Sequence, residues 1–200
     1  GTAYWKAGKL DKAGEILGQV LETQKKSIGK NNFDVALTQN DLGMVFLSKK
    51  NYSNAGKLFE QSYELKKKIL GPYNQFTITS IFNLACTNLL IGNKNKSLEY
   101  FNQSVKDYFY VLDEYFPHLS EKERLEYYNT IKGQLGAYFS FLNDELEKHP
   151  EYTGFLYDTH IKTKGLLLSE SMKLKNFLRN HPDPQVKLVF NKWTSINEEV

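Results

Sequence analysis

The stretch NDLGMVFLSKKNYSNAGKLF, residues 40–59, contains the two patterns that decide the fold. Gly43 and Phe46 share one face of a predicted helix, and Ala55 and Phe59 share one face of the next, because residues three or four apart lie on the same side of a helix. The small Gly43 and Ala55 would let the two helices approach closely, while the phenylalanines fill the space beside them. The stretch therefore predicts two packed helices joined by a tight turn.

The same pattern recurs at intervals of 42 residues along the chain. The equivalent positions are Ala13, Ala55 and Ser97, then Leu17, Phe59 and Phe101, then Ile28, Leu70 and Leu112, with Gly29 and Gly71 as predicted helix C-caps. Residues 36–117 hold two complete units, and the N-terminal part holds the end of a first helix and a whole second helix. Because such units need neighbours to bury their apolar faces, we expect this chain to be a piece of a longer array.

The order Leu-Gly-x-x-Phe followed by Ala-x-x-x-Phe resembles the tetratricopeptide repeat, whose usual unit has ~34 residues. The extra length here follows the second helix, as in kinesin-light-chain-like repeats, and the family's tryptophan position is occupied by Gln39 and Ile81. HEAT-type repeats have a similar length but lack this pattern. The resemblance implies an all-α fold, with a tetratricopeptide-type right-handed helical superhelix over residues 1–117 and a C-terminal bundle of long helices over 118–200.

The period is lost after residue 117, where long helices are predicted instead. Ser120 and Glu123 form a capping box at the start of the first one. Its apolar face consists of Tyr128, Ile131, Leu135, Phe139, Leu142 and Leu146. A second helix is predicted from about residue 151 to 179, and Asp183 is the predicted N-cap of a third that begins with Pro184. On the second helix, Ile161, Gly165, Leu168 and Met172 share one apolar face, and Leu167, Ser171, Leu174 and Leu178 share another. We therefore expect this helix to be packed on two sides, with Gly165 at a close helix crossing.

Two stretches of this region resemble the linker of CHAT proteins, which are bacterial caspase-like cysteine proteases with tetratricopeptide repeats upstream. They are LSEKER at residues 119–124 and KGLLLSE at 164–170. The resemblance implies a sensor or regulatory region that contains no catalytic residue itself and contacts a protease domain beyond Val200. A free-standing adaptor that binds an extended peptide is the alternative.

In tetratricopeptide arrays the first helix of each repeat lines a concave groove that holds a protein or peptide partner. The resemblance assigns eight residues to this groove, namely Leu37, Asn40, Met44, Leu47, Thr79, Phe82, Cys86 and Leu89. Asn40 could hydrogen-bond both the N–H and the C=O of a bound peptide, while Met44 and Phe82 could offer adaptable apolar contacts. Alternatively, several of these residues pack against the neighbouring repeat or the C-terminal helices.

No pattern in the chain indicates catalysis or a cofactor. A CHAT protease needs a histidine base and a cysteine thiolate, but Cys86, the single cysteine, falls in register with the repeat and is interpreted as a packing residue. The four histidines show no pair at helical spacing, so no metal site is predicted. The acidic pairs Asp144-Glu145 and Glu198-Glu199 are expected on helix surfaces.

Composition limits the partners and the location. The net charge is +3, and only Arg124 and Arg179 among the 26 basic residues are arginines, so direct readout of nucleic acid is not indicated. The runs Lys25-Lys26 and Lys66-Lys67-Lys68 are predicted to be solvated helix faces. No apolar run approaches the ~20 residues that span a bilayer. A single cysteine fits a reducing compartment, and we expect a cytoplasmic location without membrane attachment.

Overall fold

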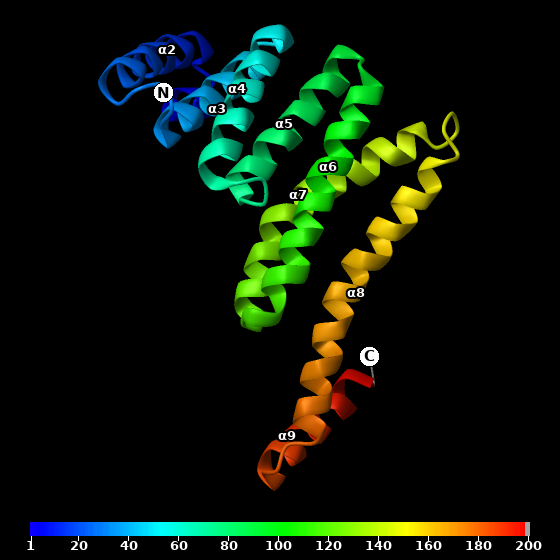
Figure 1. Ribbon diagram of the computed structural model, residues 1–200. Helices are drawn as coiled ribbons and strands as arrows, with labels where there is room; N and C mark the ends of the chain where they lie inside the picture. The colour runs from blue at the N-terminus through cyan, green and yellow to red at the C-terminus, as the bar shows by residue number, and fades with distance from the viewer. Residues whose placement is uncertain (199–200) are drawn as a thin grey trace. The chain divides into compact units, whose positions relative to one another are not determined.

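The computed structural model describes the backbone of residues 1–198, and the side chains except those of Pro117, Glu121, 165–175 and 193–198. The described residues form helices and contain no strand, which confirms the predicted all-α class (Figure 1). The helices are α1 (Thr2–Lys6), α2 (Leu10–Ser27), α3 (Phe33–Ser48), α4 (Tyr52–Leu70), α5 (Gln75–Ile91), α6 (Lys94–Tyr115), the short 3-10 helix η1 (Phe116–His118), α7 (Glu121–Glu145), α8 (Tyr152–Arg179) and α9 (Pro184–Glu198). None of the described helices is both long and apolar enough to cross a bilayer.

The chain forms two compact units, residues 1–135 and 136–200. The division falls within α7, so the first turns of that helix belong to the first unit and its end to the second. The boundary at residues 117 and 118 that the loss of the repeat indicates stays a prediction.

Helical hairpins build the first unit (Figure 1). Helix α3 packs on α4 and α5 packs on α6, and the hairpins are joined by contacts of α2 with α3 and of α4 with α5. The repeat of 42 residues extends to the helix caps. Asn32 and Asn74 cap the first helices, and Asn51 and Asn93 cap the second ones, each through a side-chain oxygen that accepts a backbone N–H. Asparagine suits this position because its short side chain satisfies an otherwise unpaired helix donor.

The predicted close approach of the two helices occurs at Gly43. A Cβ atom at this position would lie 2.7 Å from Cε1 and 2.9 Å from Cδ1 of the Phe59 ring. Ala55 is fully buried on the facing helix. The absence of a side chain at Gly43 therefore makes room for the ring of Phe59, as the sequence predicts.

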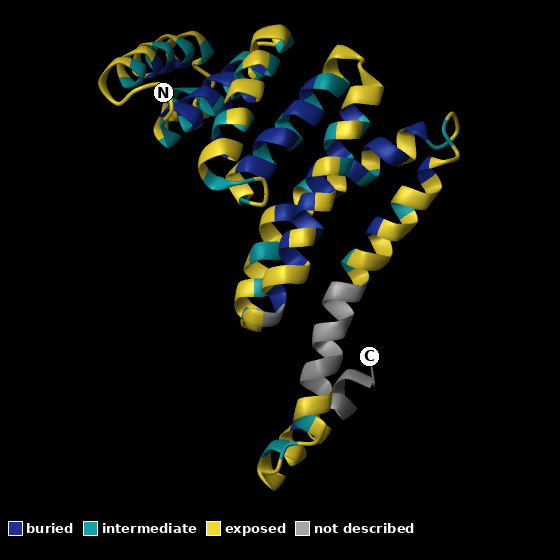
Figure 2. Ribbon diagram, viewed as in Figure 1, coloured by how far each residue is buried: buried dark blue, intermediate teal, exposed yellow. Residues whose placement is uncertain are grey.

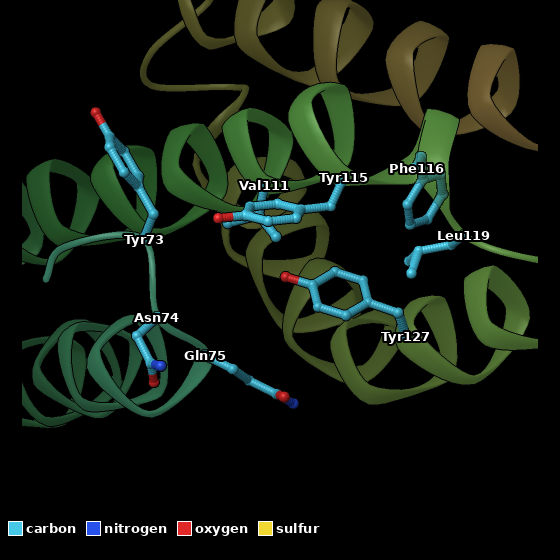
Figure 3. Close-up of a pocket in the computed structure, with 8 residues that line it drawn as sticks. All are labelled: Tyr73, Asn74, Gln75, Val111, Tyr115, Phe116, Leu119 and Tyr127. Atoms are coloured by element: carbon cyan, nitrogen blue, oxygen red, sulfur yellow. The ribbon is translucent and has the colours of Figure 1, made fainter. Parts of the chain in front are cut away.

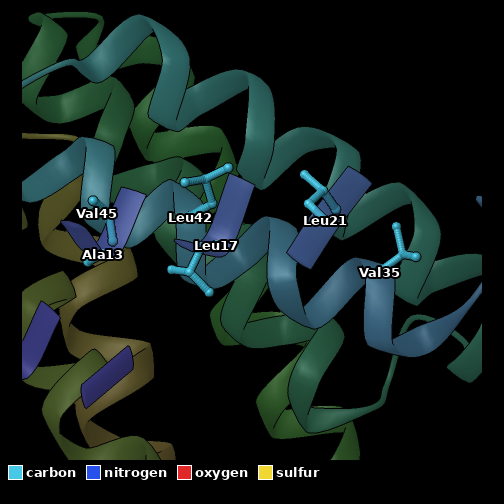
Figure 4. Packing of buried hydrophobic residues seen from close by; sticks show 6 residues of the cluster. All are labelled: Ala13, Leu17, Leu21, Val35, Leu42 and Val45. Carbon is cyan, nitrogen blue, oxygen red and sulfur yellow. The ribbon is translucent and has the colours of Figure 1, made fainter. Parts of the chain in front are cut away.

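First and second helices are buried to different degrees (Figure 2). Helices α3 and α5 carry buried residues around most of their circumference, because each lies between the hairpin before it and its own second helix. Helices α2 and α4 bury one stripe and expose the rest. One apolar cluster joins Ala13, Leu17 and Leu21 of α2 to Val35, Leu42 and Val45 of α3 (Figure 4). The core is thus continuous from one hairpin to the next.

The predicted caps of the later helices are present. The Ser120 N–H donates to Glu123 Oε2 at 2.8 Å, and the Glu123 N–H donates to Ser120 Oγ at 3.4 Å. In the second unit the Gln185 N–H donates to Asp183 Oδ1 at 2.8 Å, which confirms the N-cap before Pro184. Both helix starts follow from local sequence alone.

The predicted packing of α8 on two sides is tested only in part. Gly165, Leu167, Leu168, Ser171, Met172 and Leu174 lie outside the described side chains. Ile161, assigned to one of the buried faces, is 50% exposed, so the prediction is wrong at this residue. Leu178 is half-buried.

Two predictions of solvated charge are also wrong. Lys66, the first residue of the lysine run on α4, is only 2% exposed, whereas Lys67 and Lys68 face solvent as expected. Glu145 at the end of α7 is 6% exposed, while its neighbour Asp144 is exposed. In each case one residue of a charged run lies on the packed side of its helix, because successive residues differ by about 100° around the axis. The pair Glu198-Glu199 lies outside the described side chains.

Candidate functional site

The eight predicted groove residues lie on two adjacent first helices. Leu37, Asn40, Met44 and Leu47 belong to α3, and Thr79, Phe82, Cys86 and Leu89 belong to α5. All eight are half-buried, so each retains some accessible surface. Their role in binding a partner stays a prediction.

A hydrogen bond joins the two helices at the centre of this set. The Asn83 Nδ2 on α5 donates to Asn40 Oδ1 on α3 at 3.1 Å. Next to this pair, burial raises the pKa of Asp41, although a hydrogen bond from Asn40 and the charge of Lys66 oppose the shift. Sequence analysis did not identify Asn83, because its equivalent one repeat earlier is Asp41 rather than an asparagine.

The larger apolar members of the set already contact other helices. Met44 and Leu47 pack against the cluster of Ala55, Phe59 and Leu84. The ring of Phe82 meets that of Phe101 edge to face, with 5.5 Å between ring centroids. The alternative interpretation, packing within the array, therefore holds for part of each of these side chains.

The two remaining polar members show no sign of chemistry. Thr79 Oγ1 donates to the carbonyl of Gln75 at 2.9 Å, within its own helix. Burial raises the pKa of the Cys86 thiol to about 11, so this group is a neutral thiol at physiological pH. Within the described part of the chain, no group of histidine, cysteine or acidic side chains could hold a metal ion.

A pocket that sequence analysis did not predict lies near the end of the repeats (Figure 3). It has a volume of about 310 Å³, and Tyr73, Asn74, Gln75, Val111, Tyr115, Phe116, Leu119 and Tyr127 line it. None of these side chains is charged. The buried Tyr127 hydroxyl has no hydrogen-bond partner in the described structure, and burial raises its pKa. The pocket thus offers aromatic surface and one unused hydroxyl.

Comparison with protein families identifies the repeat. The model of the tetratricopeptide repeat matches residues 1–68 and 34–108, which together are more than half of the chain. The chain belongs to the tetratricopeptide repeat family. The matched residues contain α1 to α5 and most of α6.

Solved tetratricopeptide structures show the same fold. The chain is similar to the TPR-like repeats of a Podosopora anserina kinesin light chain, with a TM-score of 0.52 and 15% identity over 86% of this chain and 92% of that one. A point variant of that protein matches equally well. These matches confirm the predicted tetratricopeptide superhelix. No curated protein matches the chain.

One position in the tetratricopeptide array repeatedly buries a polar side chain. Gln24, Lys66 and Tyr108 are 42 residues apart on the second helices. The Gln24 Oε1 is buried without a partner among the described residues, the Lys66 Nζ donates to Ser80 Oγ at 2.9 Å, and the Tyr108 hydroxyl bonds to Gln134. Burial lowers the pKa of Lys66 to about 8 and raises that of Tyr108 to about 12. At two of its three occurrences, Lys66 and Tyr108, this position joins a second helix to the α-helix that follows it by a side-chain hydrogen bond.

Proposed function

We propose that this tetratricopeptide scaffold binds an extended peptide of a partner protein along α3 and α5. The observation that carries the proposal is the placement of eight half-buried residues on two adjacent first helices. Half-buried side chains on a rigid helical surface can contact a ligand without a costly rearrangement. No residue of the described chain is assigned a catalytic role.

The Asn40–Asn83 pair is the proposed polar centre of this surface. A side-chain amide has two donor hydrogens and an acceptor oxygen, and only the Asn40 oxygen and one Asn83 donor are used between the two residues. One hydrogen of the Asn40 amide is bonded to Asp41, so the remaining donor hydrogens and the Asn83 oxygen can meet the C=O and N–H of an extended peptide backbone. Met44 and Phe82, on either side, would supply apolar contact for its side chains.

Selection from a library of displayed random peptides on the intact chain tests this proposal. The dissociation constant of a selected peptide is then measured for Asn40→Ala and Phe82→Ala, with Asn54→Ala on α4 and Phe155→Ala on α8 as matched, exposed controls. We expect each groove variant to bind about tenfold more weakly, a loss of about 1.4 kcal/mol, and both controls to bind normally. Circular dichroism checks that Phe82→Ala is folded. Unchanged affinity in both groove variants would contradict the proposal.

We further propose that the chain is a regulatory region of a bacterial, cytoplasmic caspase-like protease of the CHAT type. The support is the capping box at Ser120, the length of α8 and the new helix start at Asp183, which fit the linker suggested by the sequence resemblance. In this scheme α7 to α9 transmit peptide binding to a protease domain. Reading the gene beyond Val200 tests it. A strand-rich continuation with a His-Gly and an Ala-Cys stretch is expected, and a polar tail would favour the free-standing adaptor instead.

A further inference from the structure

A second cavity lies between the second helices of successive repeats and is separate from the predicted groove residues. Its volume is about 280 Å³. The lining residues are Tyr63 and Lys67 of α4, Pro72, Ile81 of α5, and Glu99, Tyr100, Gln103 and Asp107 of α6. We call it the aspartate pocket. None of these residues is among the eight predicted groove residues, so a ligand here would contact a different set of side chains.

Asp107 is the buried charge of the aspartate pocket. The residue is 5% exposed, and its Oδ1 accepts a hydrogen bond of 2.7 Å from Gln103 Nε2. No other hydrogen bond to this carboxylate is present among the described residues. Burial raises its pKa, although the bond from Gln103 and the charges of Lys106 and Lys67 oppose the shift. A carboxylate can accept about four hydrogen bonds, so this one retains unused capacity.

The repeat itself shows that the fold does not need this aspartate. The residue 42 positions earlier is Leu65, which packs against the preceding apolar cluster. The two tyrosines of the aspartate pocket also have leucines as their equivalents one repeat earlier, where Leu21 corresponds to Tyr63 and Leu58 corresponds to Tyr100. Three positions that carry leucine in one repeat therefore carry tyrosine or aspartate in the next. Such departures from the packing rule are typical of binding sites.

The pocket has an excess of negative charge and ring faces that attract cations. Glu99 and Asp107 outnumber Lys67, the single basic residue in the lining. Lys67 Nζ lies 5.4 Å from the centroid of the Tyr63 ring, and Lys96 Nζ lies 5.5 Å from that of Tyr100. Both lysines are exposed on flexible stems. A cation that entered the pocket would thus meet two carboxylates and two aromatic rings.

We propose that the aspartate pocket binds an arginine side chain of a partner protein. A guanidinium group is planar, so it can stack on a tyrosine ring while it donates two parallel hydrogen bonds to the Asp107 carboxylate. Its charge balances the excess of one negative charge in the lining. An ammonium group fits less well because it is more strongly hydrated and cannot form the parallel pair of bonds. This site extends the proposed function by a second contact surface and does not depend on groove binding.

Titration of the intact chain with N-acetyl-L-arginine amide, followed by NMR, tests the proposal. The signals observed are the backbone amide of Asp107 and the side-chain amide of Gln103. We expect saturable shifts in the millimolar range, as is reasonable for one charged contact. The same titration with N-acetyl-L-citrulline amide, which has nearly the same shape but no charge, should give no saturable shift. Equal shifts with both probes would overturn the proposal.

Three variants, with a fourth in reserve, make the test specific. Asp107→Asn keeps the shape and the bond from Gln103, and should weaken arginine binding at least tenfold. Lys67→Met removes the competing cation, and should strengthen binding severalfold. Glu114→Gln, an exposed carboxylate elsewhere on α6, should change nothing. If Asp107→Asn is unfolded by circular dichroism, Glu99→Gln takes its place and should weaken binding severalfold. Unchanged binding in the carboxylate variant used, or weaker binding in Lys67→Met, would overturn the proposal.

Discussion

The Lys66 ammonium nitrogen lies 2.9 Å from the Ser80 hydroxyl oxygen, in the contact between one helical hairpin and the next. Burial lowers the pKa of this lysine to about 8, and the charge of Asp41 compensates only in part. The array thus holds a costly charge at a position where the following repeat uses a tyrosine.

Replacement of this charge by an apolar side chain of similar length should stabilise the fold. We expect Lys66→Met to raise the free energy of unfolding at pH 7 by about 2 kcal/mol, because a buried ammonium with one hydrogen bond is replaced by a group that prefers burial. Urea denaturation followed by circular dichroism measures the change. The matched control is Lys67→Met, one residue along and exposed, which should change stability by less than about 0.5 kcal/mol.

The same substitution should change the pH dependence of stability. The pKa of Lys66 is lower in the folded state than in the unfolded one, so the unfolded state binds more protons between about pH 8 and pH 10.5. As pH rises through that window, Lys66 loses its charge and the wild-type chain therefore becomes more stable. Below about pH 8 the lysine is charged in both states, so the free-energy cost of burying its charge is constant. The advantage of Lys66→Met should shrink from pH 7 to pH 10. An advantage of equal size at both values would show that charge burial is not the cause.

The close contact at Gly43 should tolerate no added methyl group. Gly43→Ala would place Cβ 2.7 Å from the Phe59 ring, which is fixed in the core. Because this contact is below 3.0 Å and the ring is fully buried, we expect an overpacking cost in the upper part of the range of about 1–3 kcal/mol, which exceeds the gain of about 1 kcal/mol in helix propensity. Gly18→Ala on α2 is the control, because its Cβ would meet nothing within 4 Å and the propensity gain should appear alone. Thermal unfolding of the two variants should shift in opposite directions.

Asp107 should reduce stability relative to the residue of the preceding repeat. We expect Asp107→Leu to raise the free energy of unfolding by about 1 kcal/mol, since it removes a buried charge, and to abolish arginine binding. The pKa of this carboxyl is higher in the folded state than in the unfolded one. The free-energy cost of burying its charge is therefore fully present above the folded pKa, and it disappears as pH falls below the unfolded pKa of about 3.9. Urea denaturation at pH 7 and pH 3.5 should therefore show the advantage only at pH 7. Asp113→Leu, at an exposed position, is the control.

The capping box should protect the first turn of α7. Hydrogen bonds from the Ser120 hydroxyl and N–H lower the pKa of Glu123. The stability that these bonds contribute is therefore present above the unfolded pKa of Glu123, and it is lost as pH falls through the lower folded pKa. Ser120→Ala should accelerate hydrogen exchange of the amides at residues 122–124 severalfold at pH 7. Thr130→Ala, whose hydroxyl bonds to a carbonyl within the helix, should leave these amides unchanged.

The local features of the fold could be predicted from sequence, since they depend on residues a few positions apart. The contact at Gly43, the cap at Asp183 and the period of 42 all follow from spacing and residue type. Lys66 was misplaced because a run of three lysines on a helix indicates a solvated face. Its equivalence to Gln24 and Tyr108 is the signal that could have revealed its burial, since tyrosine at the third position is rarely a fully solvated residue.

The candidate sites were less accessible to sequence reasoning. The spacing placed Asn40 on a half-buried surface but could not show its bond to Asn83, because that contact exists only when two hairpins stack. The aspartate pocket likewise combines residues of α4, α5 and α6, which come together only when successive repeats pack. Comparison of Asp107 with Leu65 would have marked it as unusual, but the burial of its carboxylate depends on how closely the neighbouring helices pack.

The main contacts in the array join helices that follow one another along the chain, from α1 with α2 through to α5 with α6. None of these main contacts ties one part of the array to a distant part, so a tensile force along the stack would detach it hairpin by hairpin. Each step would release the length of one hairpin. Under such a load the array would therefore lengthen in steps instead of unfolding all at once at a single threshold.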